Sequence, residues 1–319
     1  MAYSVSEADP VVKYPESALR AFATDVLRTL GADDEEAAIV SDGVITASLW
    51  YHPGQGQGLE KLFRYERRIQ AGGIVPAVDM RWEREAPAAA LLDAASGFGY
   101  VAGHRAMKRA IEMARRTGIA MVGVRHSNHF GIAGYHALQA AEAGLVGWAF
   151  TNARSEMAPW GSATPVLGTN PWGIAVPRPD AAPILLDIAL TMSGKGMMRW
   201  YERTGREMPV TWALTKDGRE TTDPSQAMDG PMLPIGAYKG YGLSLVSDVL
   251  SGVMTGALFG LDVFQDEAKY DVGHTMIAID PHLFLGKEAF EERLRTFIDQ
   301  VLGAPPIDPG QPVRLPGDL

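Results

Sequence analysis

The chain has 319 residues, of which 46% are hydrophobic, and its formal net charge at pH 7 is −9. This length allows two or three domains, and an acidic chain lacks the basic surface that nucleic acids and anionic membranes require, so we expect neither as a partner. The absence of cysteine excludes disulfides, thiol nucleophiles and cysteine-bound zinc. No apolar run is long enough for a bilayer and the N-terminus has no signal pattern, so we predict a cytoplasmic enzyme.

The first 75 residues are expected to form a helical segment. Apolar residues recur at helical spacing over 17–30, and Asp33 is a candidate N-cap for a second helix that reaches about residue 50. A polar, glycine-rich stretch at 51–58 leads to a third helix over 59–71, which the glycines after it end.

Strand and helix patterns then alternate to the end of the chain. The expected strands and helices are judged from apolar periodicity and from the glycines and prolines that interrupt it. In chain order they are a strand at 88–93, a helix at 100–117, a strand at 119–124, a strand at 183–189, a flexible stretch at 192–198, a strand and turn at 212–223, an apolar helix at 238–257, a strand at 275–280 and a helix at 287–302.

One glycine motif resembles a nucleotide-binding signal. Gly97 and Gly99 follow a strand and open a helix, which formally fits the dinucleotide fingerprint. The next strand ends without an acidic residue that would hold a ribose, so we do not expect a Rossmann fold.

The stretch 122–177 is the part around which the chain is expected to be organised. A strand leads into a polar turn that contains His129, and Gly131 and Gly134 then open a helix. A helix N-terminus offers free N–H groups and the positive end of the helix dipole. We therefore expect an anion or phosphate site beside His129, with a capped surface turn as the equally consistent alternative.

Three blocks in this order resemble the malate/L-lactate dehydrogenase family of non-Rossmann oxidoreductases. They are SNHFGIAGYHA at 127–137, GTNPWGIAVP at 168–177 and GAYKGYGLSLVSDVLSGVMTGALFG at 236–260. The family includes sulfolactate, ureidoglycolate and diketogulonate oxidoreductases and cyclic imino-acid reductases, and the resemblance runs from about residue 18 to the C-terminus.

The resemblance implies an α/β fold with a non-Rossmann NAD(P)-binding domain, a mixed, largely antiparallel sheet and a helical N-terminal segment. It implies three parts, namely 1–75 as the helical segment, 76–125 with 250–319 as the substrate and dimer domain, and 126–249 as the NAD(P)-binding domain. It also implies a homodimer with active sites near the subunit interface.

The sequence departs from the family at the catalytic motif. The family has Ser-His-Gly followed by an arginine, where the histidine is the acid/base and the arginine grips the substrate carboxylate. Aligned from the Arg64-Tyr65 pair, Gly-Gln replaces Ser-His and Lys61 replaces the arginine; aligned from His52, Gly-Gln stands there again. Glutamine cannot shuttle a proton, and lysine keeps the charge of arginine without its fork.

Four residues are therefore the main candidates for catalysis, and Tyr65 is a fifth. We expect Lys61 to hold the carboxylate, Gln57 to orient the carbonyl by hydrogen bonding, and His129 or His52 to supply the proton, with Tyr65 as a further candidate acid. A solvated loop histidine remains an alternative for His52, whereas the matching block around His129 favours a functional role.

By the same resemblance, the cofactor is NAD or NADP, and no spacing typical of a metal site occurs. The expected cofactor-binding residues are His129, Phe130, Gly131, Ile132, Ala133, Asn152, Thr169, Asn170, Asp187, Ile188, Ala189, Lys239, Gly240, Arg314, Pro316 and Gly317.

The predicted activity is the NAD(P)-dependent interconversion of a small 2-oxo acid and a 2-hydroxy acid, with a small anionic substrate. One alternative is reduction of a cyclic imine, which asks less of a protein acid, although Met197 stands where the imino-acid reductases have an aspartate. The other alternative is a catalytically silent homologue that binds the nucleotide, which the Gly-Gln replacement favours.

Overall fold

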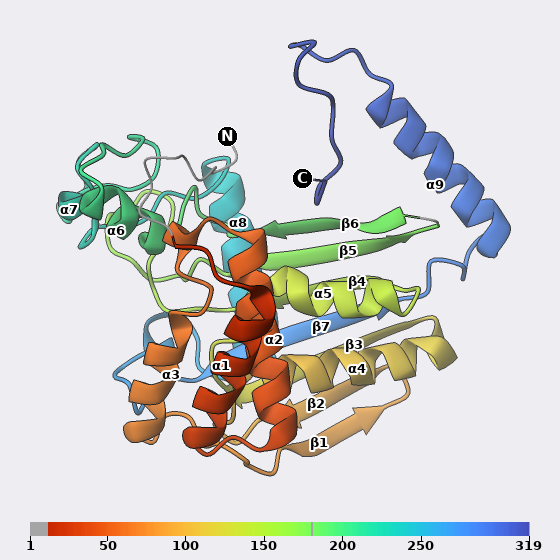
Figure 1. Cartoon of the computed structure of the whole chain (residues 1–319), viewed down its shortest axis with the longest axis horizontal. Coiled ribbons are helices and arrows are strands. Elements are labelled where there is room, and N and C mark those ends of the chain that lie inside the picture. The colour runs from red at the N-terminus through yellow and green to blue at the C-terminus, as the bar shows by residue number, and fades with distance from the viewer. Residues whose placement is uncertain (1–11, 180, 319) are drawn as a thin grey trace.

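The computed structural model describes residues 12–179 and 181–318. Its N-terminal part contains the three predicted helices, α1 (Glu16–Thr29), α2 (Asp34–Trp50) and α3 (Lys61–Gln70). A short 3-10 helix, η1 (Pro53–Gln55), lies between α2 and α3. Asp33 is the N-cap of α2, because its carboxylate accepts the N–H of Glu36 at 2.8 Å. The three helices lie together beside one end of a sheet (Figure 1).

The sheet has seven strands in the order β1-β2-β3-β7-β4-β5-β6, and β2 and β3 form its parallel pair. The remaining neighbours are antiparallel, so the prediction of a mixed, largely antiparallel sheet is confirmed. The strands are β1 (Arg81–Ala86), β2 (Ala89–Asp93), β3 (Ile119–Ser127), β4 (Val146–Thr151), β5 (Trp172–Arg178), β6 (Ala181–Ile188) and β7 (Val272–Ile279).

Strand β7 joins the two parts of the sheet that the sequence analysis assigned to separate domains. It pairs with β3 on one side and with β4 on the other. The expected boundary between 125 and 126 falls inside β3. The division into three domains therefore stays a prediction, and what the structure has is one continuous sheet.

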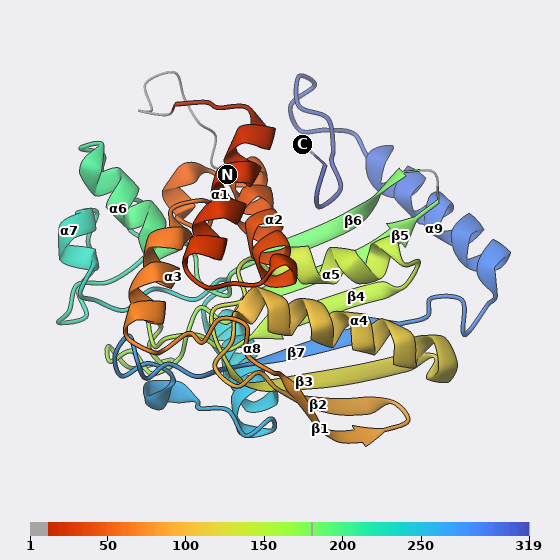
Figure 2. The ribbon, with the colours of Figure 1, turned by 60° about the horizontal axis from the view of Figure 1, so that its bottom comes forward.

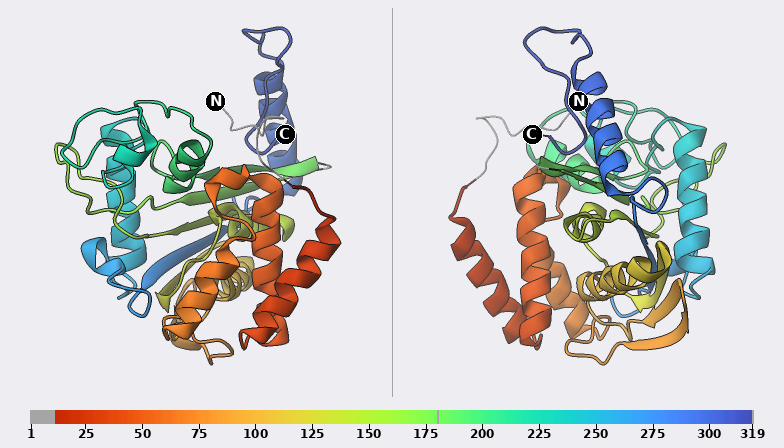
Figure 3. Two further views of the ribbon diagram at one scale, coloured as in Figure 1. Left: turned by 60° about the vertical axis from the view of Figure 1, so that its left-hand side comes forward. Right: turned by 90° about the vertical axis from the view of Figure 1, so that its right-hand side faces the viewer.

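Helices cover both faces of this sheet (Figures 2 and 3). Helices α4 (Gly99–Thr117) and α5 (Ala133–Glu142) lie on one face, and α8 (Tyr238–Asp248) with its π-helical continuation η2 (Val249–Val253) lies on the other. Helix α5 can approach β5 closely because Gly173 has no side chain, and a Cβ there would stand 2.3 Å from the carbonyl carbon of Ala133. This contact fixes the N-terminus of α5 at the strand ends.

One stretch differs from the expectation of flexibility. Residues 195 onward form helix α6 (Lys195–Arg203), followed by the short α7 (Pro224–Ala227). This stretch is helical because it can bury an apolar side against the rest of the protein. The buried side chains of α6 are Met197, Met198 and Trp200. The strand and turn expected at 212–223 are present as isolated bridges around a turn at Gly218, which has a φ of +82°.

The last helix, α9 (Lys287–Leu302), has the bounds that the apolar spacing predicts, yet none of its residues is buried. It stands away from the sheet, and the chain then returns to β6 (Figure 1), where the N–H of Leu185 donates to the carbonyl of Pro316 at 2.9 Å. Within the described ranges, no helix is both long and apolar enough to cross a membrane.

Candidate active site

A cleft of about 680 Å³ lies where the N-terminal helices meet the sheet. Its walls come from η1 and α3, from the segments that follow β3, β4 and β6, from the first turn of α6, and from residues 264–272 before and at the start of β7. This volume falls within the range of ligand and cofactor pockets. The candidate site therefore combines segments that lie far apart in the sequence.

The cleft concentrates positive charge in an otherwise acidic protein. Seven cationic and three acidic side chains line it, whereas the whole chain carries −9. Such a site favours anionic ligands. The cationic residues are Lys61, Arg64, Arg67, Arg68, Arg154, Lys195 and Arg199, and the acidic residues are Glu156, Asp187 and Glu267.

Helix α3 presents one face to the cleft. Lys61, Arg64, Tyr65 and Arg68 follow the i, i+3, i+4, i+7 spacing of a single helix face, and all four line the cleft. Lys61 is buried at 6% exposure. Burial is the main cause that lowers its pKa to about 7, and the neighbouring Arg64 adds to this effect, while Glu60 and Glu156 oppose it.

His129 faces the same space from the segment after β3. Its Nδ1 accepts the N–H of Gly131 at 3.3 Å and lies 3.4 Å from the hydroxyl of Tyr65. Because a backbone N–H can only donate, the neutral ring carries its proton on Nε2. Burial and the nearby Lys61 and Arg64 charges lower the pKa of His129 well below its usual value, so the ring is neutral at pH 7.

Asp187 occupies part of the expected anion site. Its Oδ2 accepts the N–H of Gly134 at 2.9 Å, in the first turn of α5, and its carboxylate also accepts a hydrogen bond from the hydroxyl of Tyr51. Burial raises the pKa of Asp187 to about 6, against the lowering effect of these two donors. At least one of the N–H groups expected for a bound phosphate is thus already paired within the chain.

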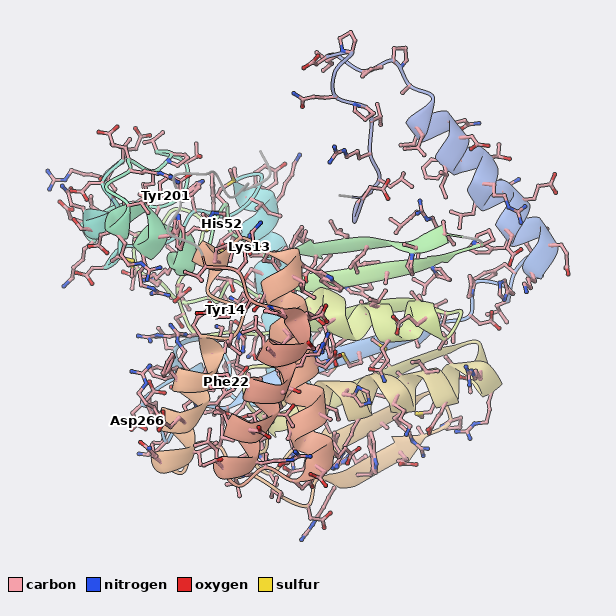
Figure 4. All side chains as sticks on the ribbon, in the orientation of Figure 1. Lys13, Tyr14, Phe22, His52, Tyr201 and Asp266 are labelled. Carbon is pink, nitrogen blue, oxygen red and sulfur yellow. The ribbon has the colours of Figure 1, made fainter. Side chains whose placement is uncertain are left out.

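The two candidates from the early loop differ in position. Gln57 lines the cleft, and its buried Oε1 has no hydrogen-bond partner among residues 12–179 and 181–318. His52 is buried beside the cleft rather than among its lining residues, and Figure 4 shows it near α6. Its Nδ1 accepts the N–H of Gly54 at 2.9 Å, and its ring packs edge-on against Trp200 with centroids 5.0 Å apart.

Comparison with known proteins identifies the family and the fold. The family model described as "Malate/L-lactate dehydrogenase" matches residues 14–319. The chain belongs to the malate/L-lactate dehydrogenase family. It is 40% identical over 299 residues to "Malate dehydrogenase" of Pyrococcus abyssi, covering 91% of this chain and 82% of that protein. It is 35% identical to "L-sulfolactate dehydrogenase" of Methanocaldococcus jannaschii, covering 92% and 85%.

The solved structures agree with the sequence relatives. Malate dehydrogenase from Entamoeba histolytica superposes with a TM-score of 0.90 at 31% identity, covering 96% of this chain and 89% of that chain. Two further relatives carry their cofactor in their names, "(2R)-3-sulfolactate dehydrogenase (NADP(+))" of Chromohalobacter salexigens at 34% identity and "Ureidoglycolate dehydrogenase (NAD(+))" of Escherichia coli O157:H7 at 31%. The predicted family, fold, enzyme class of NAD(P)-dependent 2-hydroxyacid dehydrogenase and type of cofactor are thus confirmed.

The residues of this family member fit a dinucleotide in part of the cleft. Arginine and lysine side chains suit a diphosphate, and Thr169 and Asp187 present polar groups that suit ribose or amide atoms. The amide of Asn152 lines the cleft but is already bonded to Asp248, Leu258 and Gly273. Of the expected cofactor residues, ten line the cleft, namely His129, Phe130, Gly131, Ile132, Ala133, Asn152, Thr169, Asp187, Ile188 and Ala189.

Six expected cofactor residues lie elsewhere. Asn170 is buried and donates through Nδ2 to the carbonyl of Ser244 at 2.8 Å. Lys239 and Gly240 are in the first turn of α8, and Arg314, Pro316 and Gly317 lie in the terminal segment whose Pro316 carbonyl pairs with β6. None of the six lines the cleft of this chain.

Arg64 and Tyr51 line the cleft but are not among the residues predicted from the sequence. The signal for Arg64 was available, because it lies three residues after Lys61 on an amphipathic helix and therefore shares its face. Tyr51 carried no such signal, since its partner Asp187 follows more than a hundred residues later. Among the described side chains, no group of three or more His, Asp or Glu could hold a metal ion.

Proposed function

We propose that the chain reduces a small 2-oxo acid bearing a second acidic group, with NADH or NADPH as the reductant, and catalyses the reverse oxidation of the 2-hydroxy acid. The observation that supports this most is the cluster of Lys61, Arg64 and Arg199, three cations that line the cleft and make no ion pair with a described residue. Cations left unpaired by the protein are available to a dianionic substrate.

Each group has a distinct task in this proposal. The reduced nicotinamide supplies a hydride to the carbonyl carbon. The guanidinium forks of Arg64 and Arg199 hold the acidic groups of the substrate, and Lys61 contacts the carboxylate next to the carbonyl. The Nε2–H of neutral His129 donates a hydrogen bond that polarises the carbonyl oxygen, and the amide of Gln57 orients it. His52 keeps η1 in place through its contacts with Gly54 and Trp200.

The test is oxidation of NADH and NADPH against a panel of acids. The names of the relatives suggest the 2-oxo forms of malate and sulfolactate as dianionic substrates, with pyruvate and glyoxylate as matched monoanions and a cyclic imine as the alternative class. We expect turnover with the dianions at a kcat/KM at least tenfold above that with the monoanions. Turnover with the imine alone would support an imine reductase, and nucleotide binding without any turnover would support a silent homologue.

We further propose that two copies of the chain associate through α8 and η2. Five large apolar side chains of these helices are 37–51% exposed, namely Leu243, Leu245, Val246, Val249 and Val253. The helices themselves lie on the outside of the sheet (Figure 3). Monomeric proteins rarely expose a contiguous apolar surface of this kind. The cytoplasm remains the proposed compartment, supported by the lack of cysteine, and fractionation of cells would test it.

A further inference from the structure

Lys61 is a buried residue at the cleft whose ammonium has no acceptor among the described residues. Its side chain begins in the first turn of α3 and is 6% exposed, yet its Nζ has no hydrogen bond or ion pair with any residue that the structure describes. A buried charge is usually paired, because burial without a partner is costly. The exceptions that proteins keep are commonly functional.

The charged groups around Lys61 are two carboxylates and two guanidinium groups. Glu60 and Arg64 are its neighbours on α3, Glu156 faces it from the segment after β4, and Arg199 faces it from α6. His129 lies on the remaining side and feels the charge of Lys61. The two carboxylates favour the ammonium, whereas burial, Arg64 and Arg199 oppose it, and the opposing effects dominate because the pKa of Lys61 is lowered to about 7.

His129 has the opposite properties for proton transfer. Its Nδ1 is engaged by the N–H of Gly131, and the surrounding cations hold its pKa well below the usual range. A neutral imidazole donates a hydrogen bond but is a poor source of a transferred proton near pH 7. Lys61 is present in both protonation states at that pH, and a lysine ammonium can release a proton where a guanidinium cannot.

We propose that Lys61 is the catalytic acid, which donates the proton to the carbonyl oxygen of the bound 2-oxo acid and takes it back during oxidation of the 2-hydroxy acid. This inference rests on the proposed function. In a 2-oxo acid the carboxylate and the carbonyl are on adjacent carbons, so one ammonium can contact an oxygen of each. Arg64 and Arg199 then keep the substrate anchored after Lys61 has lost its charge.

The step balances without a further reactant. A hydride from the reduced nicotinamide forms the new C–H bond at the carbonyl carbon, which is thereby reduced while the nicotinamide is oxidised. The π electron pair of the carbonyl moves to its oxygen, where an O–H bond forms as an N–H bond of Lys61 breaks. The products are the 2-hydroxy acid, the oxidised nicotinamide and a neutral amine, which regains its proton from water.

The decisive measurement is the pH dependence of kcat/KM for wild type and for Lys61→Arg, which keeps the charge but cannot release a proton. For reduction by wild type, we expect kcat/KM to fall as the pH rises through about 7, because kcat/KM reports the protonation of the free enzyme and the ammonium is the reactive form. Lys61→Arg should lose about 100-fold or more in kcat, and its kcat/KM profile should lack this alkaline limb. Its affinity for the 2-hydroxy acid, measured by quenching of bound NAD(P)H fluorescence, should change less than about threefold, since the positive charge remains.

Chemical rescue separates proton transfer from charge and from folding. Lys61→Ala should be inactive and should recover turnover with added ethylamine, a cation that carries transferable protons. It should not recover with tetramethylammonium, a cation that has none. Far-UV circular dichroism of each variant checks the fold, so that a misfolded protein is not counted as a catalytic loss.

Several outcomes would overturn the assignment of Lys61. If Lys61→Arg keeps both its kcat within a few-fold and the limb near pH 7, Lys61 only holds the carboxylate. If His129→Asn abolishes that limb while Lys61→Arg retains it, His129 is the acid. Equal rescue by tetramethylammonium would show that charge alone is needed. Failure of wild type with every 2-oxo acid would instead reject the proposed function, and the two failures are therefore distinguishable.

Discussion

Replacing Lys61 by methionine tests how much the buried ammonium destabilises the folded chain. Methionine has a similar length and no charge, so Lys61→Met removes the ammonium while it fills much of the same volume. Because the pKa of Lys61 falls from 10.5 to about 7 on folding, the folded state disfavours the ammonium relative to the unfolded chain. We expect the variant to be more stable than wild type at neutral pH and nearly inactive.

The magnitude follows from the size of this pKa change. A change of about 3.5 units corresponds to about 5 kcal/mol at 1.36 kcal/mol per unit, and local relaxation reduces this to about 2–5 kcal/mol. Between about pH 7 and 10 the unfolded chain binds more protons at this site than the folded chain, so the stability of wild type rises with pH. The advantage of Lys61→Met is therefore largest at or below pH 7 and shrinks toward pH 10.

Urea unfolding followed by tryptophan fluorescence at pH 6.5, 8 and 9.5 measures this advantage, at one protein concentration because association changes apparent stability. Lys108→Met is the matched control, since Lys108 is exposed on α4 and its replacement should change the free energy of unfolding by less than about 0.5 kcal/mol. If Lys61→Met is no more stable than wild type at pH 6.5, or if its advantage does not change with pH, the reasoning from burial is wrong.

Three further predictions follow from the charges and the exposed face. Burial raises the pKa of Asp187 from 3.8 to about 6, so the destabilisation by its charge sets in above about pH 4 and is complete above about pH 6. The stability advantage of Asp187→Asn over wild type should therefore grow by about 1–3 kcal/mol from pH 4 to pH 7, and thermal melts that show the same advantage at both pH values would contradict this. Arg199→Gln should raise KM for a dianionic acid roughly tenfold or more while kcat changes little, and steady-state kinetics showing equal losses with monoanions would argue against a role of Arg199 in holding the second acid group. Val246→Glu places a charge on the α8 face and should weaken self-association at least about tenfold, as measured by sedimentation; an unchanged molecular mass would place the interface elsewhere.

Much of the fold was predictable from local sequence patterns. Helix α9 has the predicted bounds because apolar spacing and the flanking glycines determine a helix without reference to the rest of the chain. Asp33 was identified as an N-cap for the same reason, since its acceptor geometry involves only the next three residues. Helix α6 was missed because its glycine and polar entry resembles a loop until burial of Met197 and Met198 is known.

The candidate site was predictable only where its residues belong to a continuous motif. The block around His129 is recognisable in the sequence, whereas the proximity of Lys61 to Arg199 depends on how α6 packs beside η1. The low pKa of Lys61 has the same origin. No sequence pattern distinguishes a buried lysine from an exposed one on the same helix, because burial is a property of the assembled cleft.

The position of β7 has a consequence for biosynthesis. Strands β3 and β4 are complete at residue 151, but both require β7, which begins at Val272. At a synthesis rate of roughly 5–20 residues per second, the ribosome needs on the order of ten seconds to supply it. During this interval the nascent chain exposes two strand edges with unsatisfied N–H and C=O groups, which are templates for aggregation. A chain released before residue 272 would be left with two separate three-stranded sheets, so the sheet cannot close until β7 has been synthesised.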